Sequence, residues 1–216
     1  MSRKPDLLLA VDTSGADAGL ALAGADVVHT ALLPLRPGGF AATEDLAAEA
    51  SRLLEAASHH PRDLTLVAAV VGPGSYTGLR SGLAFARGVA FPRSIPAVSV
   101  STFELLAWRS AREGETVLAV LAAGPERWMV AGCRRENGDA SVVSEPATCD
   151  SANLAGLLRE RAEGAAALVT GPGQREALER ARRGLVCRVA DLLPVYVGAS
   201  PARPNRDRVA LARTAE

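Results

Sequence analysis

A short unit, in which a buried strand runs through a Gly-Pro-Gly turn into a helix, occurs twice in this chain and limits the folds that it can adopt. The two turns are Gly72-Pro73-Gly74 and Gly171-Pro172-Gly173. An apolar run of strand length comes before each turn, and a helix-forming segment follows it. Three further strand candidates and an amphipathic helix precede each unit. The shared order predicts a duplicated βββαβα unit, and therefore an α/β protein of two lobes.

The two halves of the chain are expected to contain the same elements in the same order. The first half has strands over 7–11, 20–23, 27–33 and 64–71 and helices over 43–57 and 77–90. The second half has strands over 116–122, 127–132, 141–143 and 167–170 and helices over 153–163 and 175–183. A strand over 96–100 and a helix over 101–112 join them. We therefore expect a first lobe over 1–112, a smaller and divergent second lobe over 113–195, and an Arg- and Pro-rich tail over 196–216.

The composition excludes several classes of protein. The chain has 24 basic and 24 acidic residues, and this balance argues against a protein whose main work is to bind a phosphate backbone. Lys4 is the only lysine, which excludes a P-loop ATPase and a Schiff-base enzyme, because both need a lysine at a defined buried position. Cys133, Cys149 and Cys187 form no CxxC pair, and no apolar run is long enough to span a membrane. We expect a cytoplasmic protein without membrane contact.

Asp12, Thr13, Ser14 and Gly15 follow the first expected strand directly. Ligands of open α/β sheets bind at the carboxyl ends of strands, where a carboxylate can hold water or Mg²⁺ and hydroxyl groups can approach a phosphate. Asp and Thr are equally typical of a turn between two strands, where their side chains bind the neighbouring backbone. The sequence leaves both roles open, and Asp12, Thr13 and Ser14 are candidate phosphate- or nucleotide-binding residues.

The segment Gly72–Arg80 (GPGSYTGLR) is the most distinctive stretch of the chain. Gly72, Gly74 and Ser75 form a tight turn into a helix whose first amide groups can bind an anion, so they join the candidate phosphate site. Further along, Gly78, Gly82 and Ala86 recur every four residues and give the helix a smooth face. Since glycine destabilises a helix, close packing is its natural compensation. That face serves either packing on the sheet within the chain or an interface with another protein.

A metal site and a hydrolytic triad find little support in the residues. His59 and His60 are adjacent, so on a helix their side chains point about 100° apart and are poorly placed to share one ion. A Ser–His–Asp triad would lack the GxSxG elbow that commonly carries its nucleophile. We therefore expect no metal site. The segment 200–216 carries four arginines among Pro and Asn, and it is either a solvated tail or a docking segment.

Three motifs resemble one protein family. Residues 9–14 (LAVDTS), 71–88 (VGPGSYTGLRSGLAFARG) and 96–103 (PAVSVSTF) are similar to the TsaB (YeaZ) family of bacterial threonylcarbamoyladenosine biosynthesis proteins. The resemblance extends in order over about residues 7–112, whereas the second half agrees mainly in the order of its elements. The family is in the glycoprotease-like branch of the actin/Hsp70/sugar-kinase (ASKHA) superfamily. The resemblance therefore implies a two-lobed ASKHA fold, of the ribonuclease H-like or actin-like ATPase kind.

The resemblance also implies a function and partners. Members of the family are noncatalytic and activate a metal-containing TsaD-type paralogue, which transfers a threonylcarbamoyl group to adenosine 37 of tRNAs that read ANN codons. A small TsaE-type ATPase assists, so ATP and metal are expected in the partner subunits, contact with tRNA is indirect, and this chain has no catalytic residue and requires no cofactor. The chain alone is expected to form a homodimer. Both interfaces would use the helices 43–57 and 77–90, through Leu46, Ala50, Leu53, Leu54, Gly78, Gly82 and Ala86.

These expectations lead to two substitutions and leave two other functions open. Gly82→Leu is expected to disrupt partner binding before folding, and Leu53→Asp to give a monomer.

The helix 43–57 lacks the HxxxH metal pair of the catalytic paralogue. Residues 34–43 lack the His-Ser-Glu common in the family, and Leu121-Ala122-Ala123-Gly124 replaces an Asp-Ala-Arg run, which disfavours a nucleotide site. The open alternatives are an independent ASKHA-type ATP-binding phosphotransferase or ATPase that uses Asp12, and a glycoprotease-like hydrolase.

Overall fold

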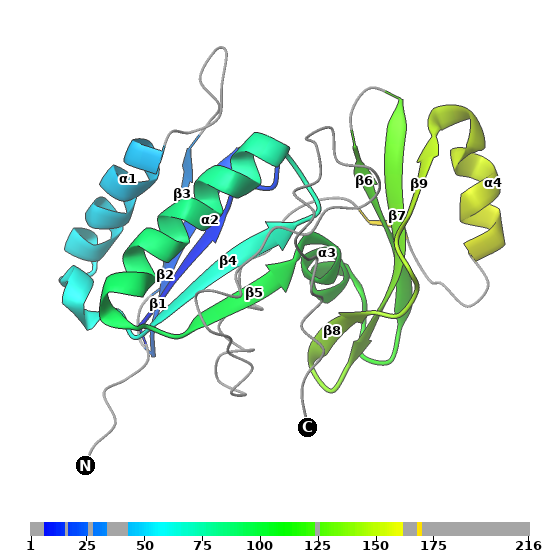
Figure 1. Cartoon of the computed structure of the whole chain (residues 1–216). Helices are drawn as coiled ribbons and strands as arrows, with labels where there is room; N and C mark the ends of the chain where they lie inside the picture. Colours follow the sequence, from blue (N-terminus) through cyan, green and yellow to red (C-terminus); the bar gives the residue numbers. More distant parts are fainter. Residues whose placement is uncertain are drawn as a thin grey trace.

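The computed structural model describes residues 7–15, 17–25, 28–33, 43–123, 126–161 and 168–169. These residues form two β-sheets with helices on their faces, and helix α3 (Thr102–Ser110) lies between the two sheets (Figure 1). The α/β class and the division into two sheets that the sequence predicts are confirmed. The second Gly-Pro-Gly turn, the helix expected after it, residues 34–42, Cys187 and the Arg-rich tail lie outside the described residues.

Five strands form the first sheet, in the order β3-β2-β1-β4-β5. They are β1 (Leu8–Asp12), β2 (Ala18–Ala23), β3 (Val28–Leu33), β4 (Leu66–Gly72) and β5 (Ala97–Ser101). β1 and β2 are antiparallel, as are β2 and β3, whereas β4 runs parallel to both β1 and β5. The carboxyl ends of β1, β4 and β5 therefore lie at one edge of this sheet.

The central strands of the first sheet are apolar without alternation because the sheet is covered on both faces. Every residue of β1, β2 and β4 is buried. Leu9 and Val11 belong to the core that helices α1 (Thr43–Ala56) and α2 (Tyr76–Ala90) close. Leu8 and Ala10 belong to the opposite core, which Leu105 of α3 enters. A strand buried on both sides needs an apolar residue at each position, and this explains the continuous runs in the sequence.

The second sheet repeats the central part of the first. Its strands are β6 (Thr116–Ala122), β7 (Arg127–Glu136), β8 (Asp139–Val142), β9 (Ala147–Asp150) and β10 (Leu168–Val169), and α4 (Ser151–Arg161) precedes β10. β6 is antiparallel to β7 and parallel to β10, just as β1 is antiparallel to β2 and parallel to β4. The predicted duplication is thus found as far as the described residues reach, which is up to the last strand of the second unit.

Two features of the second half differ from the prediction. The strand expected over 127–132 continues to Glu136, and it is long enough to pair with β8 through one part and with β9 through another. The sequence did not predict β9, in which half-buried and exposed residues alternate. Its four residues include no run of apolar side chains, so their pairing with β7, and not their composition, makes them a strand.

Helix α3 contributes to the cores of both lobes, although it lies in the segment expected to form the first lobe. Phe103, Leu106 and Ala107 are buried against the second sheet, together with Val117 and Met129. On the other side of the helix, Leu105 is buried in the core of the first sheet. Most of the helix therefore packs with the second sheet, and a boundary drawn at residue 112 separates it from the elements that bury it.

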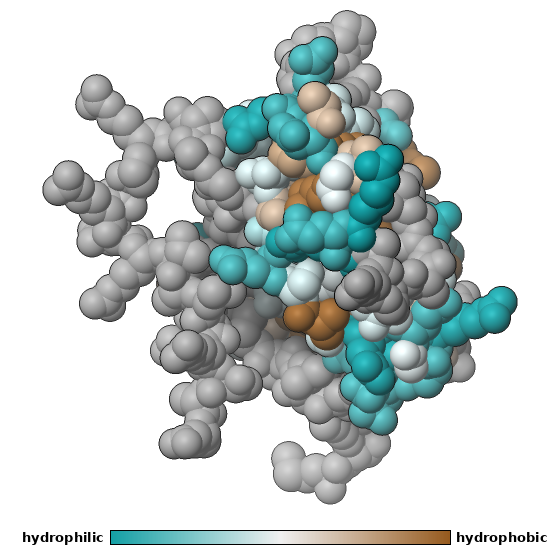
Figure 2. Space-filling view, turned by 90° about the vertical axis from the view of Figure 1, so that its right-hand side faces the viewer, coloured by the Kyte–Doolittle hydropathy of each residue, from teal (hydrophilic) through white to brown (hydrophobic). Residues whose placement is uncertain are grey.

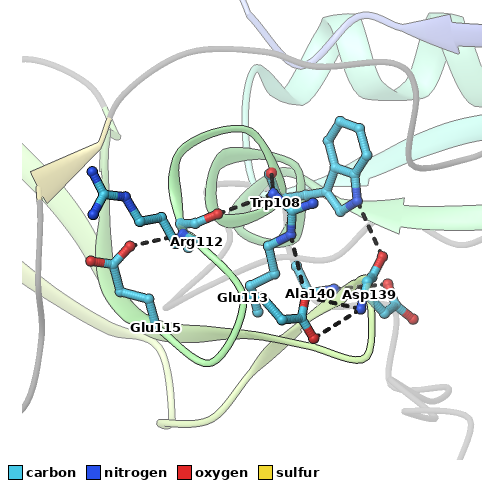
Figure 3. A network of polar contacts seen from close by, with 9 residues as sticks. Trp108, Arg112, Glu113, Glu115, Asp139 and Ala140 are labelled. Carbon is cyan, nitrogen blue, oxygen red and sulfur yellow. Dashed lines mark hydrogen bonds and ion pairs between the residues drawn. The ribbon is translucent and has the colours of Figure 1, made fainter.

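A network of polar contacts fastens the end of α3 to the hairpin between β7 and β8 (Figure 3). Arg135 Nη1 donates hydrogen bonds to the carbonyl oxygens of Trp108 at 3.0 Å and Ala111 at 3.1 Å. Its guanidinium group also lies over the Trp108 ring, 5.2 Å from the ring centre. Glu113 accepts from the Gly138 amide, and the indole of Trp108 donates to the Gly138 carbonyl. A charged side chain thus satisfies carbonyls at the helix end, where a positive charge is favourable.

The outer surface of the second lobe is formed partly by α4, which has no fully buried residue. Leu154, Leu157 and Leu158 are half-buried against Val120 and Val130. Figure 2 shows the side on which α4 lies, where hydrophilic residues cover much of the described surface and hydrophobic ones appear between them. Within the described part of the chain, no helix is long and apolar enough to cross a membrane.

Candidate functional site

The segment Asp12–Ser14 lies at the carboxyl end of β1, beside the end of β4. β1 and β4 are adjacent parallel strands, so the turn after Asp12 and the Gly-Pro-Gly turn after β4 meet at one edge of the sheet. Asp12, Thr13 and Ser14 are all buried, with exposures of 6%, 6% and 8%. The fold thus brings together the two segments that the sequence singled out. They form the candidate site.

The carboxylate of Asp12 is held by its own turn. Its Oδ1 accepts hydrogen bonds from the Ser14 amide at 2.9 Å and the Ser14 hydroxyl at 2.7 Å. Burial raises the pKa of Asp12 above the ordinary value of an aspartate, while the two hydrogen bonds from Ser14 lower it in part. The turn-forming role that the sequence left open is therefore present. It uses a carboxylate oxygen that the ligand-binding role would direct at water, Mg²⁺ or phosphate.

The segment Asp12–Ser14, here called the β1 turn, is hydrogen-bonded to the turn that begins α2. The Ser75 amide donates to the Ser14 carbonyl oxygen at 2.8 Å. Gly74 has space only for a hydrogen, since a Cβ there would overlap that carbonyl oxygen and lie 2.8 Å from the Ser14 Cβ. Gly72 has φ +106°, a conformation that favours glycine, and its peptide bond to Pro73 is cis. Glycines at 72 and 74 therefore allow the two segments to come into contact.

The first turn of α2 is capped from within the chain. Ser75 is the N-cap, and its side chain accepts a hydrogen bond from the Gly78 amide at 3.2 Å. The Ser75 amide itself is bonded to Ser14. Two amide groups that a bound anion would use at this helix start are thus directed to protein oxygens. The tight turn into a helix that the sequence predicts at Gly72, Gly74 and Ser75 is confirmed.

Thr13 lies against the middle of α2, at Gly82. A Cβ on Gly82 would overlap the Thr13 hydroxyl oxygen and lie 3.1 Å from its Cγ2 and 3.2 Å from its Cβ. The small face of α2 is therefore turned toward β1 at this position. Of the two roles that the sequence left open for this face, packing within the chain is the one that the geometry of Gly82 supports.

The seven predicted interface residues all lie inside the first lobe. Leu46, Ala50, Leu53, Leu54, Gly78, Gly82 and Ala86 are buried in the single chain. A partner that docks on α1 and α2 would meet the exposed side of these helices. The interface itself stays a prediction, but the expectation that Gly82→Leu disrupts partner binding before folding is wrong, because a large side chain at Gly82 would displace Thr13 within the chain.

Thr102 is a further polar residue at the same edge of the sheet, and the sequence reading did not single it out. It follows β5, whose last residue, Ser101, pairs with Gly72 of β4. Its exposure is 6%, and its hydroxyl oxygen is buried without a hydrogen-bond partner. The hydroxyl residues at the end of the 96–103 motif were the available signal. Their position after a buried strand matches that of Thr13 and Ser14.

The other candidate residues are separate from this edge. Among the described residues, no group of three or more His, Cys, Asp or Glu side chains is placed to hold a metal ion. His60 caps a short 3₁₀ helix (Pro61–Asp63), where its Nδ1 accepts from the Arg62 amide at 3.2 Å. Of the segment Leu121-Ala122-Ala123-Gly124, Ala122 and Ala123 are exposed at the end of β6, and Gly124 lies outside the described residues.

Two sequence comparisons agree with the motifs. A family model described as TsaD, tRNA N6-adenosine threonylcarbamoyltransferase, matches residues 41–186, which is more than half of the chain. The chain is also 34% identical over 100 residues to the tRNA threonylcarbamoyladenosine biosynthesis protein TsaB of Bacillus subtilis (strain 168). That alignment covers 46% of this chain and 43% of the relative, so the match spans less than half of the relative's length.

Solved structures show the same fold. YeaZ from Pseudomonas aeruginosa superposes with a TM-score of 0.71 at 23% identity, over 89% of this chain and 100% of that chain. A second structure, of an uncharacterized protein with similarity to peptidase YEAZ from Pseudomonas aeruginosa, has a TM-score of 0.71 at 22% identity, over 88% of this chain and 99% of the other. The predicted resemblance to TsaB (YeaZ) proteins and the predicted fold class are confirmed.

Proposed function

The chain belongs to the TsaD family of tRNA N6-adenosine threonylcarbamoyltransferases, and from this premise we propose that it acts in the biosynthesis of threonylcarbamoyladenosine in tRNA as a noncatalytic subunit. Its partner in this proposal is a metal-containing, TsaD-type paralogue that transfers the threonylcarbamoyl group to adenosine 37 of tRNAs reading ANN codons. A TsaE-type ATPase completes the set, and this chain requires no cofactor and acts on tRNA indirectly in the cytoplasm.

The noncatalytic role is supported by the hydrogen bonds of the β1 turn, whose polar groups bind other groups of the same chain. Asp12 accepts two hydrogen bonds from Ser14, and Ser14 accepts one from Ser75. A group that binds substrate or moves a proton must meet the reacting atoms at hydrogen-bond distance. Here Oδ1 of Asp12 and the carbonyl oxygen of Ser14 are engaged within the chain, and both residues are buried. The arrangement supports a turn that fixes the fold over a turn that carries chemistry.

The outer faces of α1 and α2 are the surface that this proposal assigns to the partner. The exposed residues include Ala47, Ala48, Ser51, Arg52 and Glu55 on α1 and Thr77, Arg80, Ala84, Arg87 and Gly88 on α2. α2 carries two arginines and no acidic residue, whereas α1 carries four acidic residues and one arginine. The two helices lie side by side on one face of the first sheet (Figure 1). A partner that places acidic side chains against α2 and basic side chains against α1 would fit this surface.

A reconstituted modification reaction tests the proposal. The reaction contains tRNA, threonine, bicarbonate, ATP and the other pathway proteins, and formation of threonylcarbamoyladenosine is measured with and without this chain. We expect modification to require the chain, while the chain alone neither hydrolyses ATP nor modifies tRNA. Equal modification without the chain would refute the proposal.

Two further measurements separate the remaining alternatives. If the lone chain hydrolyses ATP and Asp12→Ala abolishes this activity, the ATP-binding alternative replaces the proposed role. Ser51→Ala is the control, because Ser51 is exposed on α1, a helix that packs on β2, β3 and α2. Hydrolysis of a peptide substrate by the lone chain after metal is supplied would favour the glycoprotease-like alternative instead.

A further inference from the structure

The β1 turn touches α2 at two points that are far apart along the helix. Ser14 accepts a hydrogen bond from Ser75 at the start of the helix, and Thr13 lies against Gly82. Seven residues separate these points, which is about two turns or roughly 10 Å of helix. One contact fixes the start of α2, and the other fixes how closely its middle approaches the sheet.

The contact at Gly82 depends on the shape of both residues. The hydroxyl oxygen and the Cγ2 of Thr13 both occupy the region that a side chain at residue 82 would fill. Gly88, near the end of the same helix, has no atom within 4 Å of the equivalent position. A glycine is therefore sterically required at 82 and not at 88. The branched side chain of Thr13 packs against α2 at Gly82. Because protein interiors are close-packed, a displacement of Thr13 is transmitted to the helix.

We propose that Thr13 is a positioning residue, which seats α2 on the sheet so that the exposed residues of the helix are held in the geometry that a partner subunit binds. The partner and its docking on α2 rest on the proposed function. Thr13 itself is buried and acts only through the helix. The same chain segment that the sequence offered as a ligand-binding loop would then set the affinity of the partner complex.

Three substitutions of Thr13 test whether shape is the basis of this role. Thr13→Val keeps the branched shape, Thr13→Ser keeps the hydroxyl group and removes Cγ2, and Thr13→Ala removes both. Amide hydrogen exchange of α2 in the lone full-length chain reports how firmly the helix is seated. Titration of the TsaD-type paralogue reports the affinity. Gly88→Ala, on the same helix without a contact, is the comparison for exchange, because it is expected to slow exchange of α2 amides, opposite in direction to Thr13→Ala.

The outcomes separate this proposal from the proposed function. We expect Thr13→Ala to raise the exchange rate of α2 amides about tenfold and to weaken partner binding by a similar factor, with Thr13→Val close to the unsubstituted chain. Exchange in α4 stays unchanged. The proposal is overturned if Thr13→Ala leaves either α2 exchange or affinity unaltered, or if Thr13→Val behaves like Thr13→Ala. If the unsubstituted chain binds no paralogue, the proposed function fails, and the seating of α2 is still decided by exchange.

Discussion

Thr13, the residue after β1, and Gly82 of α2 are in direct contact, so close that a Cβ on residue 82 would lie 3.2 Å from the Thr13 Cβ. The contact joins a turn and a helix that are far apart in the sequence. It also gives a physical reason for a glycine inside a helix, where glycine costs about 1 kcal/mol relative to alanine. Thr13 and Gly82 therefore constrain each other, and their substitutions are coupled.

The first prediction compares two glycines of α2. Gly82→Ala is expected to destabilise the chain by about 1–3 kcal/mol, because the added methyl group overlaps Thr13. Gly88→Ala, with open space around it, is expected to stabilise the helix by about 0.5–1 kcal/mol. Urea unfolding followed by circular dichroism measures both. Equal effects of the two substitutions would contradict the contact at Gly82.

The second prediction concerns the dependence of stability on pH. Because burial raises the pKa of Asp12 in the folded chain, the folded state binds its proton more tightly than the unfolded state does. The stabilisation from Asp12 is therefore complete below the unfolded pKa, near 4, and is lost as pH rises through the folded pKa. Asp12→Asn is expected to remove this decrease, and unfolding free energies measured from pH 4 upward test it.

The contribution of Ser14 has the opposite sign. The hydrogen bond from its hydroxyl group lowers the pKa of Asp12, and Ser14→Ala removes this bond while keeping the one from the amide, so the substitution is expected to extend the loss of stability to higher pH and to make the chain less stable at neutral pH. If Ser14→Ala and the unsubstituted chain show the same pH profile, the hydroxyl group does not stabilise the charged carboxylate. Asp17→Asn serves as the exposed control on the same turn.

The third prediction concerns the network at the end of α3. Arg135→Ala is expected to cost about 2–3 kcal/mol, because it removes two hydrogen bonds to helix carbonyls and the contact with the Trp108 ring. Its neighbour Arg134 is exposed and lies 3.6 Å from Glu136, so Arg134→Ala is expected to cost less than about 1 kcal/mol. Thermal unfolding of the two variants measures both losses of stability. A loss from Arg134→Ala that matches the loss from Arg135→Ala would contradict this reading.

The fourth prediction revises the expected result of Leu53→Asp, which the sequence predicts to be a monomer. Leu53 is only 6% exposed and belongs to the core beneath α1, so Leu53→Asp is expected to cost more than about 3 kcal/mol and to unfold the first lobe. Ala84→Glu, on the exposed side of α2, is expected to change stability by less than about 0.5 kcal/mol.

These two variants also test the proposed partner surface. Circular dichroism checks folding, and co-purification with the TsaD-type paralogue checks binding. We expect Ala84→Glu to remain folded and to lose the paralogue. Retention of the paralogue at the level of the unsubstituted chain would exclude the centre of α2 from the interface. A folded and monomeric Leu53→Asp variant would show instead that Leu53 serves the interface more than the core.

The sequence predicted most elements of the first lobe because local signals and tertiary contacts agree there. The Ser75 cap, the glycine turn at 72–74 and the apolar run of β4 each favour the conformation that the structure shows. In the second half, β9 has no such run, and its pairing with β7 could not be read from its four residues. Local propensity is weak where a strand depends on its neighbours.

The sequence predicted which residues form the candidate site but not which partners their side chains contact. Asp12, Thr13 and Ser14 could be located, because a polar group that ends a buried strand is visible in the sequence. The direction in which each side chain bonds could not, since Asp12 and Ser14 satisfy each other, and Thr13 meets a residue almost seventy positions away. Thr102 was missed because the burial of its hydroxyl group is a property of the folded chain and leaves no mark in the 96–103 motif.

The sequence by itself determined the α/β class, the two related halves and the family, because all three rest on periodicity and on short motifs whose backbone requirements are local. Only the tertiary structure decided which face of α2 points inward and that α3 unites two cores. A run of small residues permits close approach from either side. Which surface makes that approach depends on the sheet beneath the helix, and that contact exists only once the chain has folded.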